Sequence, residues 1–253
     1  MSEESVSTRS EGAHMDLCQD CIQDLKRCLG GDLQVWPAAE ISPWPASEEV
    51  ELIFSEDLAL ELGGSNQPGA VGIFYTDREE AVGGDSVCLL GPDLDEMRKK
   101  DCGGFPLARL VLICIDTGEI KDKDQLYRML RAVEFGRYHV FPTGCAIQSS
   151  SLEQKESIRI SRRAADAGIS LASIGGLMLA AYHKIPQVKA AKIIFVTDPR
   201  ADYGQFREIA DRSEQITKAL DHLVREVMED CDICGMKVVC DQVREVMAQE
   251  FGK

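Results

Sequence analysis

Three cysteines in the C-terminal region have a spacing that could bind a metal. Cys231, Cys234 and Cys240 form a Cys-x2-Cys-x5-Cys motif. A Cys-x2-Cys pair lets the chain loop around one metal centre with both sulfurs pointing inward, and Gly235 relieves backbone crowding at such a turn. Iron–sulfur clusters and structural zinc usually have four ligands, so a fourth has to come from elsewhere. The simpler alternative is that these are reduced thiols, with Cys234 and Cys240 packed as small hydrophobic side chains.

A second group of cysteines lies near the N-terminus. Cys18, Cys21 and Cys28 fall on the apolar face of a helix predicted over residues 13–29 and ended by Gly30-Gly31. Burial on that face alone would explain them. The other interpretation is that Cys18 and Cys21 are metal ligands, either as a second set or as a contribution to the first. Cys102 is a further candidate for a fourth ligand.

The composition of the chain limits its compartment and partners. Ten cysteines among 253 residues do not indicate a disulfide framework in a reducing compartment. The net charge of −15 repels nucleic acid and anionic membrane surfaces. No apolar run approaches the roughly 20 residues needed to span a bilayer, and the N-terminus lacks a signal pattern. We therefore expect a cytoplasmic protein that binds neither nucleic acid nor membranes.

The apolar pattern predicts an α/β fold that positions these cysteines. Short apolar runs predict buried strands at 50–54, 71–75, 87–90, 110–115 and 192–196. Periodic or Ala-rich stretches predict helices at 121–135, 174–183 and about 203–229. We expect a central mixed sheet covered by helices, of the mixed α+β type, with an N-terminal helical appendage and a C-terminal cysteine-rich metal-binding segment.

These elements divide the chain into three predicted regions. Residues 1–48 hold the N-terminal helix and a Pro/Trp-rich connection, because Pro37, Pro43 and Pro45 cannot continue a helix or a central strand. Residues 49–229 form the α/β domain. Residues 230–253 form the metal-binding segment. The predicted long helix ends just before it, so that Cys231 follows the helix directly.

One stretch of the predicted domain resembles a known family. Val87 to Met97 contains Gly-Pro-Asp-Leu-Asp-Glu, which is similar to the Gly-Pro-Asp-Ile-Asp-Glu stretch of acetyl-CoA synthase, the β subunit of the carbon monoxide dehydrogenase/acetyl-CoA synthase complex. Further segments resemble that family in the same order, namely 107–115, the helix near 121–135, 158–162, 174–176 and 187–198. The resemblance covers roughly residues 50–240, the central region of the family.

The resemblance implies a role beside carbon fixation in an anaerobe. The family joins a methyl group, carbon monoxide and coenzyme A on nickel bridged to an iron–sulfur cubane, and Cys231, Cys234 and Cys240 correspond to the first cubane ligands. The sequence has no Cys-Gly-Cys, the tripeptide that holds the distal nickel in the family. We therefore expect a 4Fe–4S-binding subunit or accessory protein with a protein partner from that complex; whether it is an enzyme stays open.

A coenzyme A site is the second implication of the resemblance. Arg159 falls in the family segment associated with coenzyme A, but the preceding aromatic position is Ser157 here. Arg159, Arg162 and Arg163 could pair with phosphates, because the guanidinium fork matches phosphate oxygens. The alternative is a solvated helix face.

Two other functions stay open. One is a coenzyme A-binding enzyme component whose cluster a partner completes. The other is a structural zinc-binding interaction module. The four histidines at 14, 139, 183 and 222 form no His-x3-His pair, and no nucleophile elbow indicates a hydrolase.

Overall fold

The computed structural model describes residues 17–30, 32–64, 66–99, 104–118, 120–136, 139–150, 155–225 and 235–251. Cys102, Cys231 and Cys234 lie outside these residues. The described helices are α2 (Gln19–Leu29), α3 (Glu79–Val82), α4 (Leu94–Arg98), α5 (Lys123–Gly136), α6 (Arg162–Asp166), α7 (Leu171–Tyr182), α8 (Tyr203–Arg225) and α9 (Lys237–Phe251). The described strands are β1 (Gln34–Pro37), β2 (Leu58–Leu62), β3 (Gly69–Thr76), β4 (Ser86–Leu90), β5 (Leu107–Ile115), β6 (Cys145–Ser150), β7 (Lys155–Ser161) and β8 (Val188–Val196).

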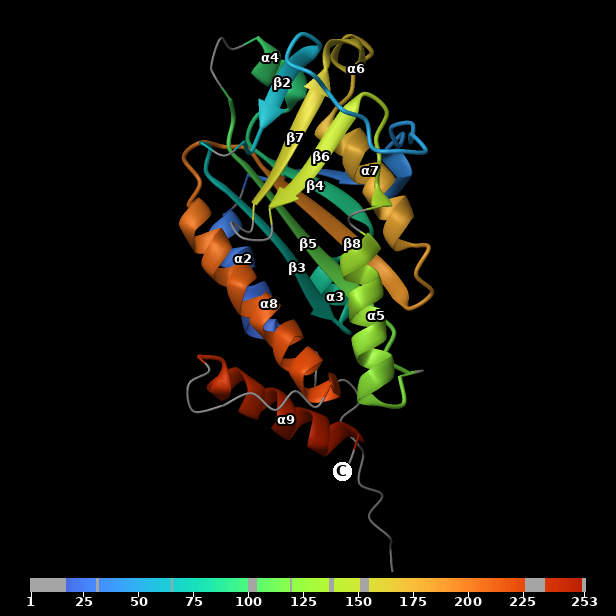
Figure 1. Cartoon of the computed structure of the whole chain (residues 1–253), viewed down its shortest axis with the longest axis vertical. Helices are drawn as coiled ribbons and strands as arrows, with labels where there is room; N and C mark the ends of the chain where they lie inside the picture. The colour runs from blue at the N-terminus through green and yellow to red at the C-terminus, as the bar shows by residue number, and fades with distance from the viewer. Residues whose placement is uncertain are drawn as a thin grey trace, which may run out of the picture.

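A five-stranded mixed sheet forms the centre of the molecule (Figure 1). Its strand order is β1-β4-β8-β5-β3. The β4–β8 and β3–β5 pairs are parallel, whereas the β5–β8 pair in the middle and the β1–β4 pair at the edge are antiparallel. All nine residues of β5 are buried, as expected for a strand covered on both faces. The predicted strands at 71–75, 87–90, 110–115 and 192–196 are confirmed.

A second, antiparallel sheet lies over one face of the first (Figure 1). Its strand order is β2-β7-β6. Leu62, Ile158 and Ile160 are fully buried and belong to the same apolar core as Leu107 and Val111 of β5. The sequence pattern did not predict this sheet.

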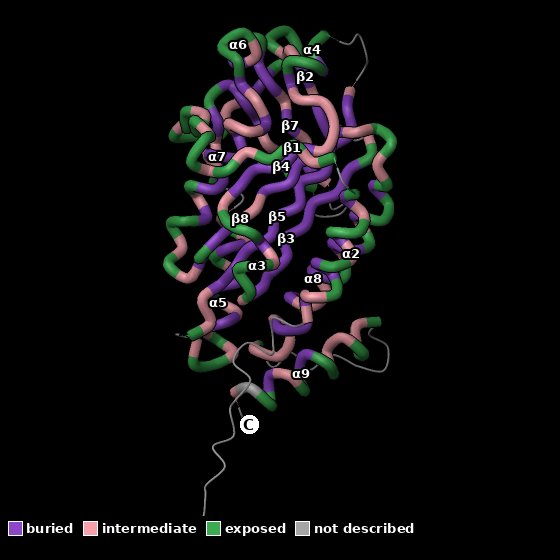
Figure 2. The backbone as a smooth tube through the Cα atoms, turned by 180° about the vertical axis from the view of Figure 1, so that it is seen from behind, coloured by how far each residue is buried: buried purple, intermediate pink, exposed green. Residues whose placement is uncertain are grey.

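The two faces of the main sheet support separate apolar cores, because side chains alternate along a strand. On one face, Val111 and Phe195 pack with α5, α7 and the second sheet. On the other face, Leu112 and Ile194 pack with α2 and the first half of α8. Figure 2 shows β3, β4, β5 and β8 of the main sheet buried along most of their length, whereas the edge strand β1 is not. The prediction of a mixed sheet covered by helices is confirmed.

The described part of the predicted N-terminal region packs directly on this body. Ile22 and Leu25 of α2 are 0% exposed and contact the core on the α8 side of the sheet. Gln34–Pro37 then adds the edge strand β1, with Pro37 as its last residue, where no further ladder hydrogen bond is needed.

The helices follow the predicted periodicity. α5 and α8 bury one face each, including Leu126 of α5 and Phe206 of α8. α7 begins at a capping box in which Ser170 and Ser173 satisfy each other's main-chain amides. The predicted end of the long helix near residue 229 lies outside the described residues. Within the described residues, no helix is both long enough and apolar enough to cross a lipid bilayer.

The predicted buried strand at 50–54 is wrong. The segment is extended but belongs to no strand, and Val50, Leu52 and Phe54 are exposed. The strand that follows in the chain, β2, begins at Leu58 instead. An apolar run predicts burial only where another element covers it, and no described element covers the outer side of this segment.

The Gly91-Pro92-Asp93 stretch joins four elements. The Asp93 carboxylate oxygen Oδ1 accepts hydrogen bonds from Leu94 N at 2.7 Å and from Leu171 N at 2.9 Å, so one carboxylate caps both α4 and α7. Gly91 has φ +114°, and a Cβ there would lie 2.3 Å from Asp198 N. The stretch therefore holds the ends of β4 and β8 against the starts of two helices.

Candidate functional site

Helix α9 brings the C-terminal cysteine segment onto the body of the protein. Its first turn carries Cys240, which is partly buried against the larger apolar core. Further along the same helix, Val243 and Met247 are 1% and 4% exposed. Because residues 240, 243 and 247 share one helix face, the burial of Val243 and Met247 turns Cys240 toward α8 and the body.

Cys18 lines the groove on which α9 packs. This small apolar groove has a volume of about 20 Å³ and is lined by Cys18, Tyr75, Leu220, Val243 and Met247 among others. Residues near both ends of the described chain therefore line one groove, and Figure 1 shows α9 below the lower end of α8. The structure thus places one N-terminal cysteine beside the helix that carries Cys240 in its first turn.

Cys21 lies in a different environment. It is 3% exposed and packs in the core on the α2 side of the main sheet, whereas Cys18 packs in the core on the other side. Burial raises the pKa of the Cys21 thiol, and burial raises the pKa of the Cys18 thiol to about 12. Without a metal, both thiols are protonated at neutral pH, so a metal would have to displace their protons.

The described residues alone do not form a metal site. Among the described residues, no group of three or more Cys, His, Asp or Glu side chains could hold a metal ion. Cys231 and Cys234, the first two residues of the predicted motif, lie outside them. Cys240 and Cys18 are soft sulfur donors, and both pack with the larger apolar core.

Arg159 is engaged within the protein. Its Nη1 donates to the main-chain oxygen of Ile53 at 3.1 Å, and its Nε lies 3.6 Å from the Glu61 carboxylate. The side chain thereby ties β7 to β2 and to the extended segment before it. A phosphate at Arg159 would have to compete with both contacts.

Arg162 and Arg163 lie at the start of α6 and are exposed. The main-chain amide of Arg162 donates to Asp57 O at 2.8 Å, which fixes the backbone but leaves the guanidinium at the surface. The described contacts therefore do not join Arg159, Arg162 and Arg163 into one anion-binding site.

The sequence analysis missed a buried ion pair. Arg109 of β5 and Glu156 of β7 are each 1% exposed, and Arg109 donates from Nε and Nη2 to the two carboxylate oxygens at 2.5 and 2.6 Å. The Ser149 hydroxyl donates to the same carboxylate at 3.1 Å. The sequence does contain a signal for this pair. Arg109 interrupts an apolar run, and Glu156 shares the inward face of β7 with Ile158.

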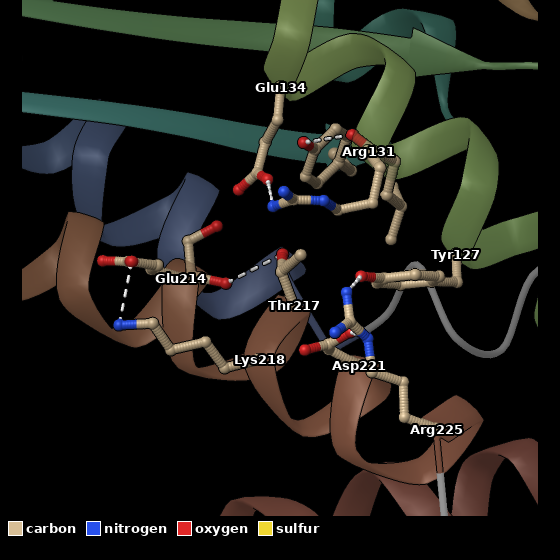
Figure 3. Close-up of polar contacts among 11 residues, drawn as sticks. Tyr127, Arg131, Glu134, Glu214, Thr217, Lys218, Asp221 and Arg225 are labelled. Atoms are coloured by element: carbon tan, nitrogen blue, oxygen red, sulfur yellow. Dashed lines mark hydrogen bonds and ion pairs between the residues drawn. The ribbon is translucent and has the colours of Figure 1, made fainter. Parts of the chain in front are cut away.

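The sequence analysis also missed a polar cavity beside this pair. It has a volume of about 70 Å³ and lies between β3, α5, α8 and the end of β6, with Tyr75, Glu134, Ser149, Glu214 and Thr217 in its lining. Figure 3 shows Glu134 on α5 and Glu214 on α8 on opposite sides of this space. Each carboxylate is paired with a cation of its own helix, Arg131 or Lys218. The cavity is therefore close to neutral in charge.

The central part of the sequence matches a known protein family. A protein-family model described as the CO dehydrogenase/acetyl-CoA synthase complex beta subunit matches residues 43–201. The match covers more than half of the chain. This chain belongs to that family. No curated protein matches its sequence.

The family match begins before β2 and ends just after β8. It includes Gly91-Pro92-Asp93 and Arg159, so the predicted relation to the family of the CO dehydrogenase/acetyl-CoA synthase complex is confirmed. Cys18, Cys21, Cys231, Cys234 and Cys240 all lie outside the matched residues. Family membership therefore does not assign them as ligands.

Proposed function

We propose that this chain is an accessory subunit of a CO dehydrogenase/acetyl-CoA synthase-type complex and binds a 4Fe–4S cluster. Cys231, Cys234 and Cys240 supply three thiolates in this proposal, and Cys18 supplies the fourth. Cys21 is the less suitable of the two N-terminal candidates, because it belongs to the α2-side core and does not line the groove beside α9. Such a cluster would serve electron transfer, scaffolding of a partner enzyme or metal-site assembly in carbon fixation.

One observation carries the proposal. Helix α9 begins three residues before Cys240, and its Val243 and Met247 line the same small apolar groove as Cys18. A cubane needs soft ligands from a loop and from a neighbouring element at one place, and this packing supplies that neighbourhood. Family membership supports the kind of complex.

The chain is not proposed to be a synthase by itself. Its sequence has no Cys-Gly-Cys tripeptide, so the family's distal nickel ligands have no counterpart in it. A coenzyme A-binding component has less support from the geometry, because Arg159 is engaged by Ile53 O and Glu61. Saturable coenzyme A binding that Arg162→Ala/Arg163→Ala abolishes would favour that alternative.

The assignment of Cys18 is tested by a matched pair of variants. Cys18→Ala and Cys21→Ala remove thiols of similar burial from neighbouring turns of the same segment. After anaerobic reconstitution with iron and sulfide, we expect Cys18→Ala to lose cluster absorbance and Cys21→Ala to keep it. Equal iron and sulfide contents in the two variants would exclude Cys18 as the fourth ligand, and bound zinc in a colourless wild type would indicate the structural zinc module.

A further inference from the structure

An extended segment before β2 carries an apolar stripe on the protein surface. Val50, Leu52 and Phe54 alternate along the chain and are 55%, 69% and 61% exposed. Three of the six exposed large hydrophobic side chains of the described residues therefore fall within five residues. We call these three residues the stripe.

The intervening residues hold the stripe outward. The Glu51 carboxylate accepts a hydrogen bond from Gly144 N at 2.9 Å. Ile53 is 8% exposed, and its main-chain oxygen accepts the 3.1 Å hydrogen bond from Arg159. Because successive side chains of an extended segment point to opposite sides, inward Glu51 and Ile53 fix Val50, Leu52 and Phe54 outward.

The segment is also anchored at its start. The Trp44 indole Nε1 donates to Thr143 O at 2.8 Å, and Ser47 N donates to Phe141 O at 2.6 Å. No described residue forms a hydrogen bond with the main chain of Leu52. The hydrogen bonds at Trp44, Ser47, Glu51 and Ile53 thus tie the segment to the body of the protein, which lowers the entropic cost of binding.

The charges beside the stripe indicate what can cover it. Glu48 and Glu49 precede it and Glu56 and Asp57 follow it, all exposed. The described contacts bring two cations near the segment: Arg159, whose guanidinium donates to Ile53 O and lies 3.6 Å from the Glu61 carboxylate, and Arg162, whose main-chain amide is bonded to Asp57 O. Two copies paired in antiparallel register around Leu52 would place Glu48 opposite Glu56, and like charges in that arrangement repel. A second copy of this chain is therefore a poor occupant.

We propose that the stripe is a docking surface for a partner subunit that presents an apolar groove bordered by Lys and Arg. The partner's cations complement the acidic residues at both ends of the stripe, and its groove removes the three side chains from water. This inference rests on the proposed function, since it names the surface by which the chain joins its complex.

The test measures binding of the full chain to a purified CO dehydrogenase/acetyl-CoA synthase complex from the same organism. Leu52→Ser/Phe54→Ser removes the stripe, and Val35→Ser/Phe135→Ser removes side chains that are 53% and 51% exposed elsewhere. We expect the stripe variant to bind at least about tenfold more weakly and the control variant to bind as wild type does. Binding should also weaken as salt is raised, because the flanking charges contribute.

The outcomes separate the two proposals. If wild type and the stripe variant bind the complex equally, the docking surface is wrong while the accessory role stands. If the wild type does not bind the complex, the accessory role itself is wrong. If sedimentation shows a wild-type dimer that Leu52→Ser/Phe54→Ser converts to a monomer, the stripe's occupant is a second copy, which overturns the proposed partner.

Discussion

Arg109 and Glu156 form a bidentate ion pair between the two sheets, with both side chains 1% exposed. Arg109 stands in β5, an inner strand of the main sheet, and Glu156 stands in β7, the central strand of the second sheet. Nη1 of Arg109 also lies 3.7 Å from the sulfur of Met178 on α7. The pair therefore fixes how the second sheet and α7 sit on the first sheet.

Removing one partner of the Arg109–Glu156 pair should destabilise the fold strongly. We predict that Arg109→Met lowers the free energy of unfolding by about 3–5 kcal/mol, because Glu156 is left charged and buried without its cation. Urea unfolding followed by circular dichroism measures the change. Arg98→Met is the control, since the Arg98–Asp166 pair is exposed and should contribute about 1 kcal/mol or less.

The double variant Arg109→Met/Glu156→Leu separates a lost charge pair from lost packing. Replacing both charges with apolar groups removes the uncompensated charge, so we expect it to be more stable than Arg109→Met. A double variant as unstable as the single one would show that packing, not charge, dominates at this site.

Asp93 should behave as a cap for two helices. Asp93→Ala leaves the amides of Leu94 and Leu171 without their acceptor, and we predict a loss of about 2 kcal/mol, roughly 1 kcal/mol for each cap. Asp93→Asn keeps an Oδ1 acceptor and should retain most of this stability. Equal losses in the two variants would contradict a capping role.

The raised pKa of the Asp93 carboxyl predicts how the stability of the fold changes with pH. Burial raises the pKa of Asp93 above its ordinary value, so the folded state holds the proton to a higher pH than the unfolded state does. Stability from this group is therefore lost as pH rises from about 3.9 through the raised folded pKa, and is constant above it. The unfolding free energy of wild type minus that of Asp93→Asn should therefore decrease as pH rises across that window. A difference that rises with pH would contradict this assignment.

Alanine substitutions at Gly91 and Gly84 distinguish the cost of backbone strain from the cost of a steric clash. Both have positive φ, but a Cβ at Gly91 would meet Asp198 N at 2.3 Å, whereas a Cβ at Gly84 has nothing within 4 Å. We predict that Gly84→Ala costs about 1 kcal/mol from conformation and that Gly91→Ala costs at least about 3 kcal/mol in unfolding experiments. Similar losses of unfolding free energy in the two variants would mean that the close approach of Asp198 to Gly91 is unimportant.

Cysteine reactivity should follow burial. Cys145 is 2% exposed, and burial, with the Glu156 and Glu51 charges, raises its pKa. Cys28 is partly exposed on α2. In the native chain at pH 8, we expect iodoacetamide to label Cys28 well before Cys145, as peptide mass spectrometry would detect, because only accessible thiolate reacts. Early labelling of Cys145 would instead reveal local opening at the start of β6.

The sequence predicted those parts of the fold that depend on local pattern. The buried strands β3, β4 and β5 follow from continuous apolar runs, and the buried faces of α5 and α8 follow from apolar residues at steps of three and four. The antiparallel β5–β8 pair and the second sheet were not predicted, because strand partners depend on contacts between distant residues. The wrong strand at 50–54 has the same cause, since an apolar run does not reveal whether anything covers it.

The candidate site was predictable to a lesser degree. Spacing identified the cysteines, but only the packing of α9 distinguishes Cys18 from Cys21, which the sequence placed on one helix face. Arg159 was predicted from the family resemblance, and its contacts with Ile53 and Glu61 show a role in joining strands. Arg109 and Glu156 are separated by 47 positions, so their pairing requires the fold.

Metal analysis after anaerobic purification, with an absorption spectrum, tests the central claim most directly. The account predicts brown wild-type protein containing iron and sulfide, and colourless Cys231→Ser/Cys234→Ser protein without them, because the remaining thiols cannot hold a cubane. Cys88→Ser serves as the control, since Cys88 is 1% exposed within β4 and far from ligand spacing. Colourless wild-type protein that contains zinc or no metal would contradict the account.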